Sequence, residues 1–230
     1  MLLSAHQNLY LPHVPFFDKL DRADVFCLFD IVQFDPHDYQ NKNRIKTKDG
    51  SQLLTVPVKG GRNQLIKDVQ IDNGNWKRKH LRAISLAYSK APHFEHYFRF
   101  LKYAYSDANV MPSLARLNEQ LIRWACRELG ITTPIVSASD YDFKGKKSDL
   151  VLDMCIKLKA TEYIFGEQGE SYCDKQAFLD AGVKPVFQSY QHPTYSQLHG
   201  EFIPKLSIVD LLMNAGQDSL EILRNATIKS

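Results

Sequence analysis

A histidine and a glutamine stand side by side near the start of the chain, where a strand is expected to end. The apolar residues 1–5 before them have the character of a strand. A loop containing two prolines leads from His6 and Gln7 into an apolar helical run that begins at Phe16. In an open α/β sheet this junction is the usual ligand site, and a helix N-terminus attracts anions. An imidazole also transfers protons near neutral pH. Both residues are therefore candidate site residues; the alternative is that they only satisfy loop carbonyl groups.

An acidic side chain follows the next expected strand. Residues 24–32 are a nearly continuous apolar run, rich in β-branched and aromatic side chains, which is typical of a strand buried on both faces. A strand, a short helix and a buried strand together form a βαβ pattern. Asp30 lies near the carboxyl end of this second strand, so we expect its carboxylate beside His6.

Amide and guanidinium side chains gather on a predicted hairpin. Asp49 and Gly50 separate two strand-like runs, and Asp-Gly at such a position is a strong hairpin signal. The polar arm before the turn carries Asn41, Asn43 and Arg44. These side chains suit the binding of carboxylate, phosphate or sugar hydroxyl groups.

Two loops in the last third of the chain are rich in polar residues. Residues 166–172 follow an expected strand, and their polar sequence is flanked by glycines, which makes this loop a ligand-binding candidate. It has neither the GxGxxG nor the P-loop pattern, so it carries no nucleotide fingerprint. A later loop, residues 188–197, is dense in Tyr, Gln and His.

The order of the expected elements favours a layered α/β sheet. Strands alternate with helices at both ends of the chain, while the middle segment, residues 75–130, has a helical pattern. The predicted hairpin belongs to an insertion at residues 41–71. We therefore expect one α/β domain over residues 1–230: a layered, mainly parallel, Rossmann-like sheet with an inserted β-hairpin and a helical middle segment.

Composition and charge narrow the class of protein. A chain of 230 residues is long enough to bury a substantial core, and its formal net charge of +3 is too small to indicate nucleic acid binding. The four cysteines form no CxxC pair and no Cys–His zinc spacing, which indicates a reducing compartment and no metal site. The sequence shows no signal peptide and no run of about twenty apolar residues. We expect a cytoplasmic protein without a membrane span.

Short motifs are distributed along the chain: HQNLYLP at 6–12, DIVQF at 30–34, NKNRI at 41–45, TVPV at 55–58, APHF at 91–94, YIFG at 163–166, YQHPTYSQ at 190–197 and LSIVDL at 206–211. In these motifs and their order the chain resembles the WbqC-like protein family over nearly its whole length. Two positions depart from the family pattern: Asn8 stands where proline commonly follows His-Gln, and Asp30-Ile31 stands where two acidic residues are often found.

This resemblance implies a transferase that decorates a sugar. Members of the family occur among genes for surface polysaccharide, notably O-antigen, and a glycine or other aminoacyl transferase role has been suggested for them. Amide formation on an amino sugar needs a base for the attacking amine and stabilisation of the oxyanion. His6 is then the base and Asp30 its orienting partner. The implied substrate-binding residues are Gln7 and Asn43 on the oxyanion or substrate, Arg44 on a phosphate or carboxylate, His192, Tyr195 and Gln197 on sugar hydroxyls, and also Gln33, Asn41, Gly166 and Tyr172.

Two other classes of function stay open. One is an ATP-dependent ligase or nucleotidyltransferase-like enzyme, because a strand, a His-containing loop and a helix resemble that fold, although its HxGH signature is absent. The other is a non-catalytic binding partner of polysaccharide enzymes. The expected substrates are an amino sugar or sugar nucleotide and an activated acyl or aminoacyl donor. The sequence leaves open whether that donor is an aminoacyl-tRNA, a thioester or an amino acid with ATP, whether a cofactor takes part, and whether the protein forms a homodimer.

Overall fold

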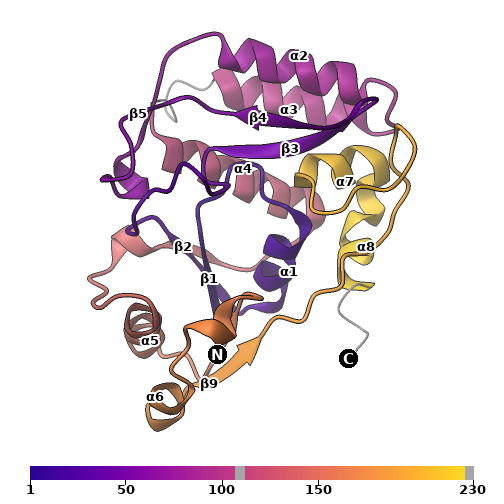
Figure 1. Cartoon of the computed structure of the whole chain (residues 1–230). Helices are drawn as coiled ribbons and strands as arrows, with labels where there is room; N and C mark the ends of the chain where they lie inside the picture. Colours follow the sequence, from indigo (N-terminus) through magenta and orange to yellow (C-terminus); the bar gives the residue numbers. More distant parts are fainter. Residues whose placement is uncertain (107–111, 226–230) are drawn as a thin grey trace.

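A five-stranded parallel sheet forms the centre of the computed structural model, which describes residues 1–106 and 112–225 (Figure 1). Its spatial order is β7-β2-β1-β8-β9, so the strands run 3-2-1-4-5 when they are counted along the chain. The order reverses between β1 and β8. The predicted layered, mainly parallel sheet is confirmed. Its strands are β1 (Leu2–Gln7), β2 (Val25–Phe29), β7 (Ile135–Ser137), β8 (Glu162–Phe165) and β9 (Lys184–Phe187).

The register of the two central strands places the candidate residues of β1 at the edge of the sheet. His6 pairs with Leu28 and Gln7 with Phe29, so both strands end at the same level. Phe26, Cys27 and Leu28 are completely buried, as a strand covered on both faces requires. The predicted strand at 24–32 is longer than the observed β2, because the chain turns away after Phe29.

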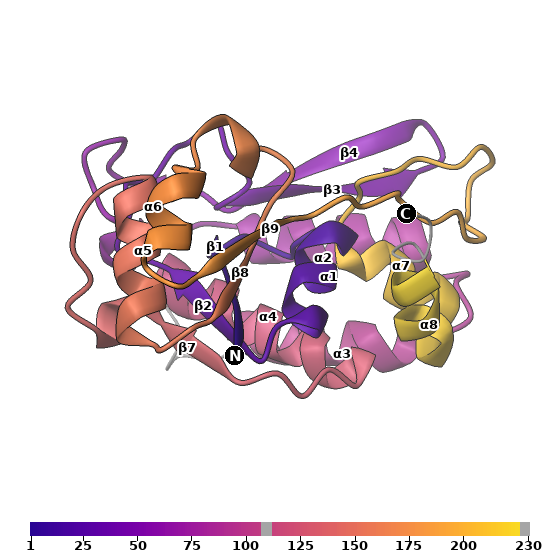
Figure 2. The same ribbon diagram turned by 90° about the horizontal axis from the view of Figure 1, so that it is seen from below.

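Helices cover both faces of the sheet (Figure 2). Helices α5 and α6 bury side chains with one face, and α1 and α4 pack with the other in the larger core cluster. The predicted helical middle segment, residues 75–130, is confirmed as three helices in the part that the structure describes, and residues 107–111 of it lie outside the described residues. The helices are α1 (Val14–Arg22), α2 (Trp76–Tyr88), α3 (Phe94–Ser106), α4 (Leu114–Leu129), α5 (Ser148–Lys157), α6 (Lys175–Asp180), α7 (Ile208–Ala215) and α8 (Ser219–Asn225).

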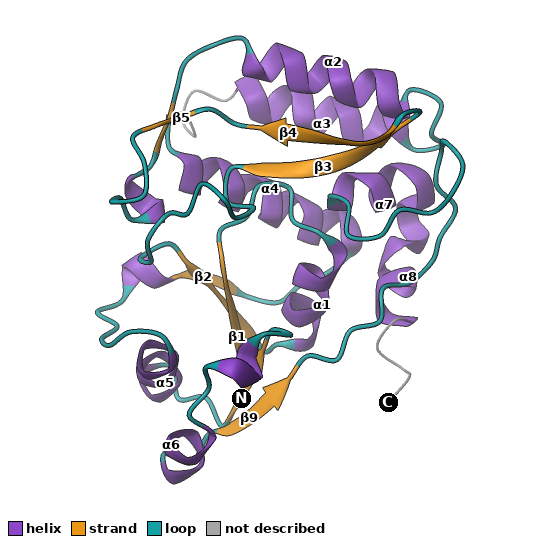
Figure 3. Cartoon of the chain, in the orientation of Figure 1, coloured by secondary structure: helices purple, strands orange, loops and turns teal. Residues whose placement is uncertain are grey.

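The predicted hairpin is also confirmed, and it lies alongside α2 (Figure 3). Gly50 adopts a φ of +106° at its turn, a conformation that glycine reaches without strain. The Tyr88 hydroxyl accepts the Lys46 amide at 2.9 Å, which joins the hairpin to the end of α2. The antiparallel strands are β3 (Lys42–Thr47), β4 (Gly50–Thr55), β5 (Val58–Lys59) and β6 (Gln70–Ile71), and the short 3-10 helices span Ile66–Asp68, Ala138–Asp140, Gly169–Ser171 and Gly216–Asp218.

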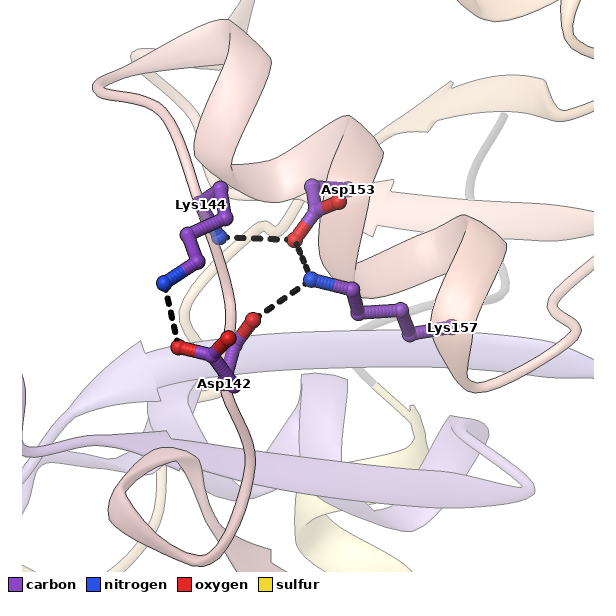
Figure 4. Close-up of polar contacts among 4 residues, drawn as sticks. All are labelled: Asp142, Lys144, Asp153 and Lys157. Carbon is purple, nitrogen blue, oxygen red and sulfur yellow. Dashed lines mark hydrogen bonds and ion pairs between the residues drawn. The ribbon is translucent and has the colours of Figure 1, made fainter.

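Four charged residues fasten the loop before α5 to that helix (Figure 4). The Lys157 ammonium donates to the Asp153 carboxylate at 2.8 Å and also to the main-chain oxygen of Asp142. The Lys144 amide donates to the same Asp153 carboxylate at 2.7 Å. These contacts join the loop to α5. Because exposed ion pairs contribute little free energy, we expect the cluster to affect the position of the loop more than the stability of the protein.

Candidate functional site

A cavity of about 450 Å³ opens at the carboxyl ends of β1 and β8. This is the point where the strand order reverses, and open α/β sheets hold their ligands in the crevice at such a point. His6 and Gln7 line the cavity from the end of β1, Gly166 from the loop after β8, and Gln188 from the segment after β9. The structure therefore brings His6, Gln7 and the predicted loop at residues 166–172 to one cavity.

His6 is half-buried, with its ring against an aromatic side chain. Its Nδ1 lies 3.2 Å from the Gln7 carbonyl oxygen, and its ring meets the Phe16 ring edge-on with centroids 5.2 Å apart. Burial, together with the positive charge of Lys19 and electrostatic repulsion from the His13 ring when that ring is protonated, holds the pKa of His6 well below its usual value. The imidazole is therefore neutral near pH 7. If Nδ1 carries the proton and donates to the carbonyl, Nε2 is the basic nitrogen.

A buried lysine contributes a cation to the same cavity. Lys19 lies on α1 and is 4% exposed, and its Nζ donates to the Ala5 carbonyl oxygen at 3.2 Å. Burial lowers its pKa to about 8, against the opposing effect of the Asp18 carboxylate. A Cβ placed on Gly166 would lie 3.7 Å from the Lys19 nitrogen. Glycine at position 166 thus leaves room next to the ammonium.

Further basic groups surround this lysine. His13, the residue before α1, lines the cavity, and its pKa is lowered to about 4 by burial, with contributions from Lys19, Lys205 and His192. Lys205 is exposed, lines the cavity and has a φ of +58°, in the left-handed region that is costly for a residue with a Cβ. The cavity therefore gathers positive charge from α1 and from the segment before α7.

Amide side chains join the walls of the cavity. The Gln7 side-chain oxygen accepts from the Gln40 amide nitrogen at 2.7 Å. Among the residues that the structure describes, no protein acceptor takes the hydrogens of Gln7 Nε2, so that group is available to a ligand. Gln188 Nε2 donates to the Asp18 carboxylate at 2.6 Å and to the Pro15 carbonyl at 2.9 Å, which holds the segment after β9 against α1.

Two partly exposed tyrosines and two acidic residues also line the cavity. Tyr39 is 37% exposed and Tyr172 is 44% exposed, so each offers part of its ring to solvent or to a ligand. Asp38 accepts the main-chain amide of Tyr39 at 2.7 Å, and Glu167 is exposed. The accessible carboxylates thus lie in loops, whereas Lys19 lies inside.

Asp30 makes different contacts from those predicted. Its carboxylate accepts the Ser139 amide at 2.9 Å and the Ser139 hydroxyl at 2.5 Å, and the residue is not part of the cavity wall. The expected contact with His6 is replaced by the bond from the His6 ring to the Gln7 carbonyl. Asp30 therefore joins β2 to the segment after β7.

The amides of the hairpin arm are used inside the fold. Asn43 is buried and donates to the Tyr10 and Leu11 carbonyls, while Asn41 donates to the Val56 carbonyl at 2.9 Å. None of the predicted residues of this arm, nor Gln33, belongs to the cavity wall. Exposed Arg44 donates to the Ser51 hydroxyl at 3.2 Å, and Gln33 donates to the Arg62 carbonyl.

The loop at residues 188–197, called the late loop below, is held by the buried carboxylate of Asp210. Asp210 accepts the hydroxyl of Tyr195 at 2.8 Å, the amide of Gln197 at 2.7 Å and the hydroxyl of Tyr88 at 2.8 Å. Tyr195 and Gln197 therefore fasten this loop to α7. The His192 ring bonds to the Pro193 carbonyl at 2.9 Å and stands near His13 without lining the cavity.

The sequence pattern did not single out His13, Lys19, Tyr39, Gln188 or Lys205. One signal was available for Lys19, because it lies between Phe16 and Leu20 on a helix whose apolar side is buried. A lysine among core positions is unusual. Among the described residues, no three His, Cys, Asp or Glu side chains are placed to hold a metal ion, and no helix is long and apolar enough to cross a membrane.

The fold and the site define an α/β protein with a cavity at the switch point of a parallel sheet. The model of the WbqC-like protein family matches residues 7–222, and the chain belongs to that family. It is 35% identical over 221 residues to the uncharacterized protein Rv1507c of Mycobacterium tuberculosis (strain ATCC 25618 / H37Rv), and the match covers 95% of each chain. No solved structure matches the chain.

Proposed function

We propose that the protein is a transferase that attaches an acyl or aminoacyl group, such as glycyl, to an amino sugar or a sugar nucleotide in surface polysaccharide (O-antigen) biosynthesis. The observation that carries this proposal is the position of the His6 imidazole at the cavity wall, at the end of β1 and next to Gln7. A neutral imidazole accepts a proton, which is what an attacking amine must lose.

The reaction is a nucleophilic acyl substitution. The sugar amine attacks the carbonyl carbon of an activated ester or thioester, a C–N bond forms, and the bond from that carbon to the leaving oxygen or sulfur breaks. His6 takes the amine proton and returns it to the leaving group. The free Nε2 hydrogens of Gln7 donate to the oxyanion of the tetrahedral intermediate. Preorganised hydrogen-bond donors of this kind lower the activation barrier of acyl transfer.

A direct test supplies purified protein with an amino sugar or its nucleotide and with three donors in parallel. The donors are glycyl-tRNA, a glycyl thioester, and glycine with ATP and magnesium, and mass spectrometry detects the acylated sugar. We expect product with glycyl-tRNA or the glycyl thioester, loss of turnover in His6→Ala with the fold retained, and normal turnover in His96→Ala, whereas product only with glycine, ATP and magnesium would favour the ligase. His96 is a matched control because it is an exposed histidine on α3, paired with Glu128 outside the cavity. Near-normal turnover in His6→Ala would remove His6 from the mechanism, and no product with any donor would contradict the transferase proposal.

A second candidate function is an ATP-dependent ligase or a nucleotidyltransferase-like enzyme. It is favoured by the strand order, because the cavity lies at a reversal point of the kind where doubly wound sheets hold nucleotides. Thermal unfolding with ATP and magnesium separates the two. A ligand that binds the folded state raises the melting temperature, so a rise with ATP and magnesium that exceeds the rise with uridine diphosphate supports the ligase, and no excess favours a donor activated elsewhere.

A further inference from the structure

The ammonium of Lys19 is buried beside empty space. An ammonium has three hydrogen-bond donors, and the Ala5 carbonyl takes one of them at 3.2 Å. The neighbouring Asp18 carboxylate is shared, since it accepts from Gln188 at 2.6 Å and lies 3.6 Å from the Arg22 guanidinium. Burying a cation is costly unless a partner compensates it. A function for this charge therefore has to be sought in the cavity that Lys19 lines.

The cavity wall opposite Lys19 leaves room for an anionic partner of the ammonium. Gly166 is the residue whose added Cβ would lie 3.7 Å from the Lys19 nitrogen, which is van der Waals distance. A glycine there keeps the space over the ammonium open. The cavity of about 450 Å³ is large enough for a small organic ligand.

The charges around the cavity are unevenly distributed. Lys19 lies inside, Lys205 is exposed at the wall, and the N-terminal end of α1, with its positive dipole end, contributes His13. The acidic wall residues, Asp38 and Glu167, lie in loops, and Asp38 is engaged by the amide of Tyr39. The wall thus carries two lysines and two carboxylates, with Lys19 inside and both carboxylates in loops, so an anionic group inside the cavity meets the ammonium of Lys19.

We propose that the cavity binds an anionic group of its substrate, a phosphate or a carboxylate, on the Lys19 ammonium, with Lys205 as a second cation at the wall. The proposal rests on the proposed function and specifies its substrate: a phosphate is supplied by a sugar nucleotide, whereas a carboxylate is supplied by a free amino acid, the donor of the ATP-dependent alternative. Lys19 is a binding residue in this scheme, and His6 beside it accepts the proton.

Isothermal titration calorimetry on the full chain tests the proposal without turnover. The probes are pyrophosphate, uridine diphosphate, uridine and glycine, each at the same ionic strength, with wild type, Lys19→Met and Lys48→Met. Lys48 is an exposed lysine in the hairpin turn, so its variant is a control for the loss of one charge. We expect a diphosphate or glycine to bind wild type and Lys48→Met alike, and to bind Lys19→Met at least tenfold more weakly. Binding of the phosphates identifies a sugar nucleotide as the source, and binding of glycine identifies a free amino acid, as the ATP-dependent alternative requires.

Amine labelling provides a measurement on the wild type alone. Acetic anhydride modifies unprotonated amines, and peptide mass spectrometry reports each lysine separately. The anion that binds should lower the labelling rate of Lys19 several-fold and leave that of Lys48 unchanged.

Failure of this proposal is distinguishable from failure of the transferase proposal. Equal affinity of wild type and Lys19→Met for a bound anion, or unchanged Lys19 labelling in its presence, overturns the anion pocket even if sugar acylation is observed. Tight anion binding through Lys19 without any acylated product upholds the pocket and contradicts the transferase.

Discussion

The side-chain amide of Asn43 donates to the Leu11 carbonyl at 2.6 Å, and this bond joins the hairpin to the loop between β1 and α1. The same amide reaches the Tyr10 carbonyl at 3.2 Å, and its oxygen accepts the Arg44 amide at 2.8 Å. Leu11 has a φ of +44°, a conformation that costs free energy in any residue with a side chain. Asn43 therefore holds a strained loop in the shape that carries His13 to the cavity.

Replacing Asn43 by Ala should lower the free energy of unfolding by about 2–3 kcal/mol, because two buried carbonyls lose their donor. Urea unfolding measures this. Asn73→Ala, an exposed position, is the control and should change the value by less than about 0.5 kcal/mol. Wild-type stability in Asn43→Ala would mean that the loop does not depend on the hairpin.

Lys19→Met should stabilise the protein at pH 7, by up to about 3 kcal/mol, while it weakens anion binding at least tenfold. The folded-state pKa of Lys19, about 8, is below the unfolded value of 10.5, so the folded state holds its proton less tightly. Between about pH 8 and pH 10.5 the unfolded state binds more protons than the folded state, so the contribution of Lys19 to the free energy of unfolding rises with pH. In urea unfolding series, the excess free energy of unfolding of Lys19→Met over wild type should thus be largest below pH 8 and decrease toward pH 10.5. A variant less stable than wild type at pH 7 would show that Lys19 is already well paired in the protein.

Gly166→Val should close the space over the ammonium with little effect on folding. Position 166 does not need the left-handed conformation, and the added side chain points at the Lys19 nitrogen rather than at packed backbone. We expect anion affinity at least tenfold lower and a change in unfolding free energy below about 1 kcal/mol. Gly61→Val is the control, because a Cβ at position 61 would meet no atom within 4 Å. Gly182 is unsuitable because its φ of +74° would strain any residue with a side chain. Unchanged anion binding in Gly166→Val would place the ligand elsewhere.

Tyr195→Phe tests whether the late loop binds sugar or only folds. The variant loses the 2.8 Å bond to Asp210, which should lower the free energy of unfolding by about 1 kcal/mol. Because this hydroxyl is used inside the protein, the Michaelis constant for the amino sugar should stay within twofold of wild type. A large rise in that constant with normal stability would return Tyr195 to the set of sugar-binding residues.

The sequence by itself determined the elements of this fold, since each depends on neighbours in the chain. The apolar run that became β2, the strands β8 and β9 and the Asp-Gly hairpin are readable because burial on one or two faces imposes a local pattern. The same local logic located His6 and Gln7, because a strand that ends before a helix places its last side chains at the edge of a sheet.

Tertiary structure decided which side chains meet. Lys19 faces Gly166 across a gap of about 150 positions in sequence, and only the strand order, with β1 next to β8, brings them together. The carboxylates of Asp30 and Asp210 found their partners in Ser139 and Tyr195 in the same way. Residue type reveals that a group can donate or accept a hydrogen bond, but the packing of distant elements determines whether a protein atom or a ligand takes that bond.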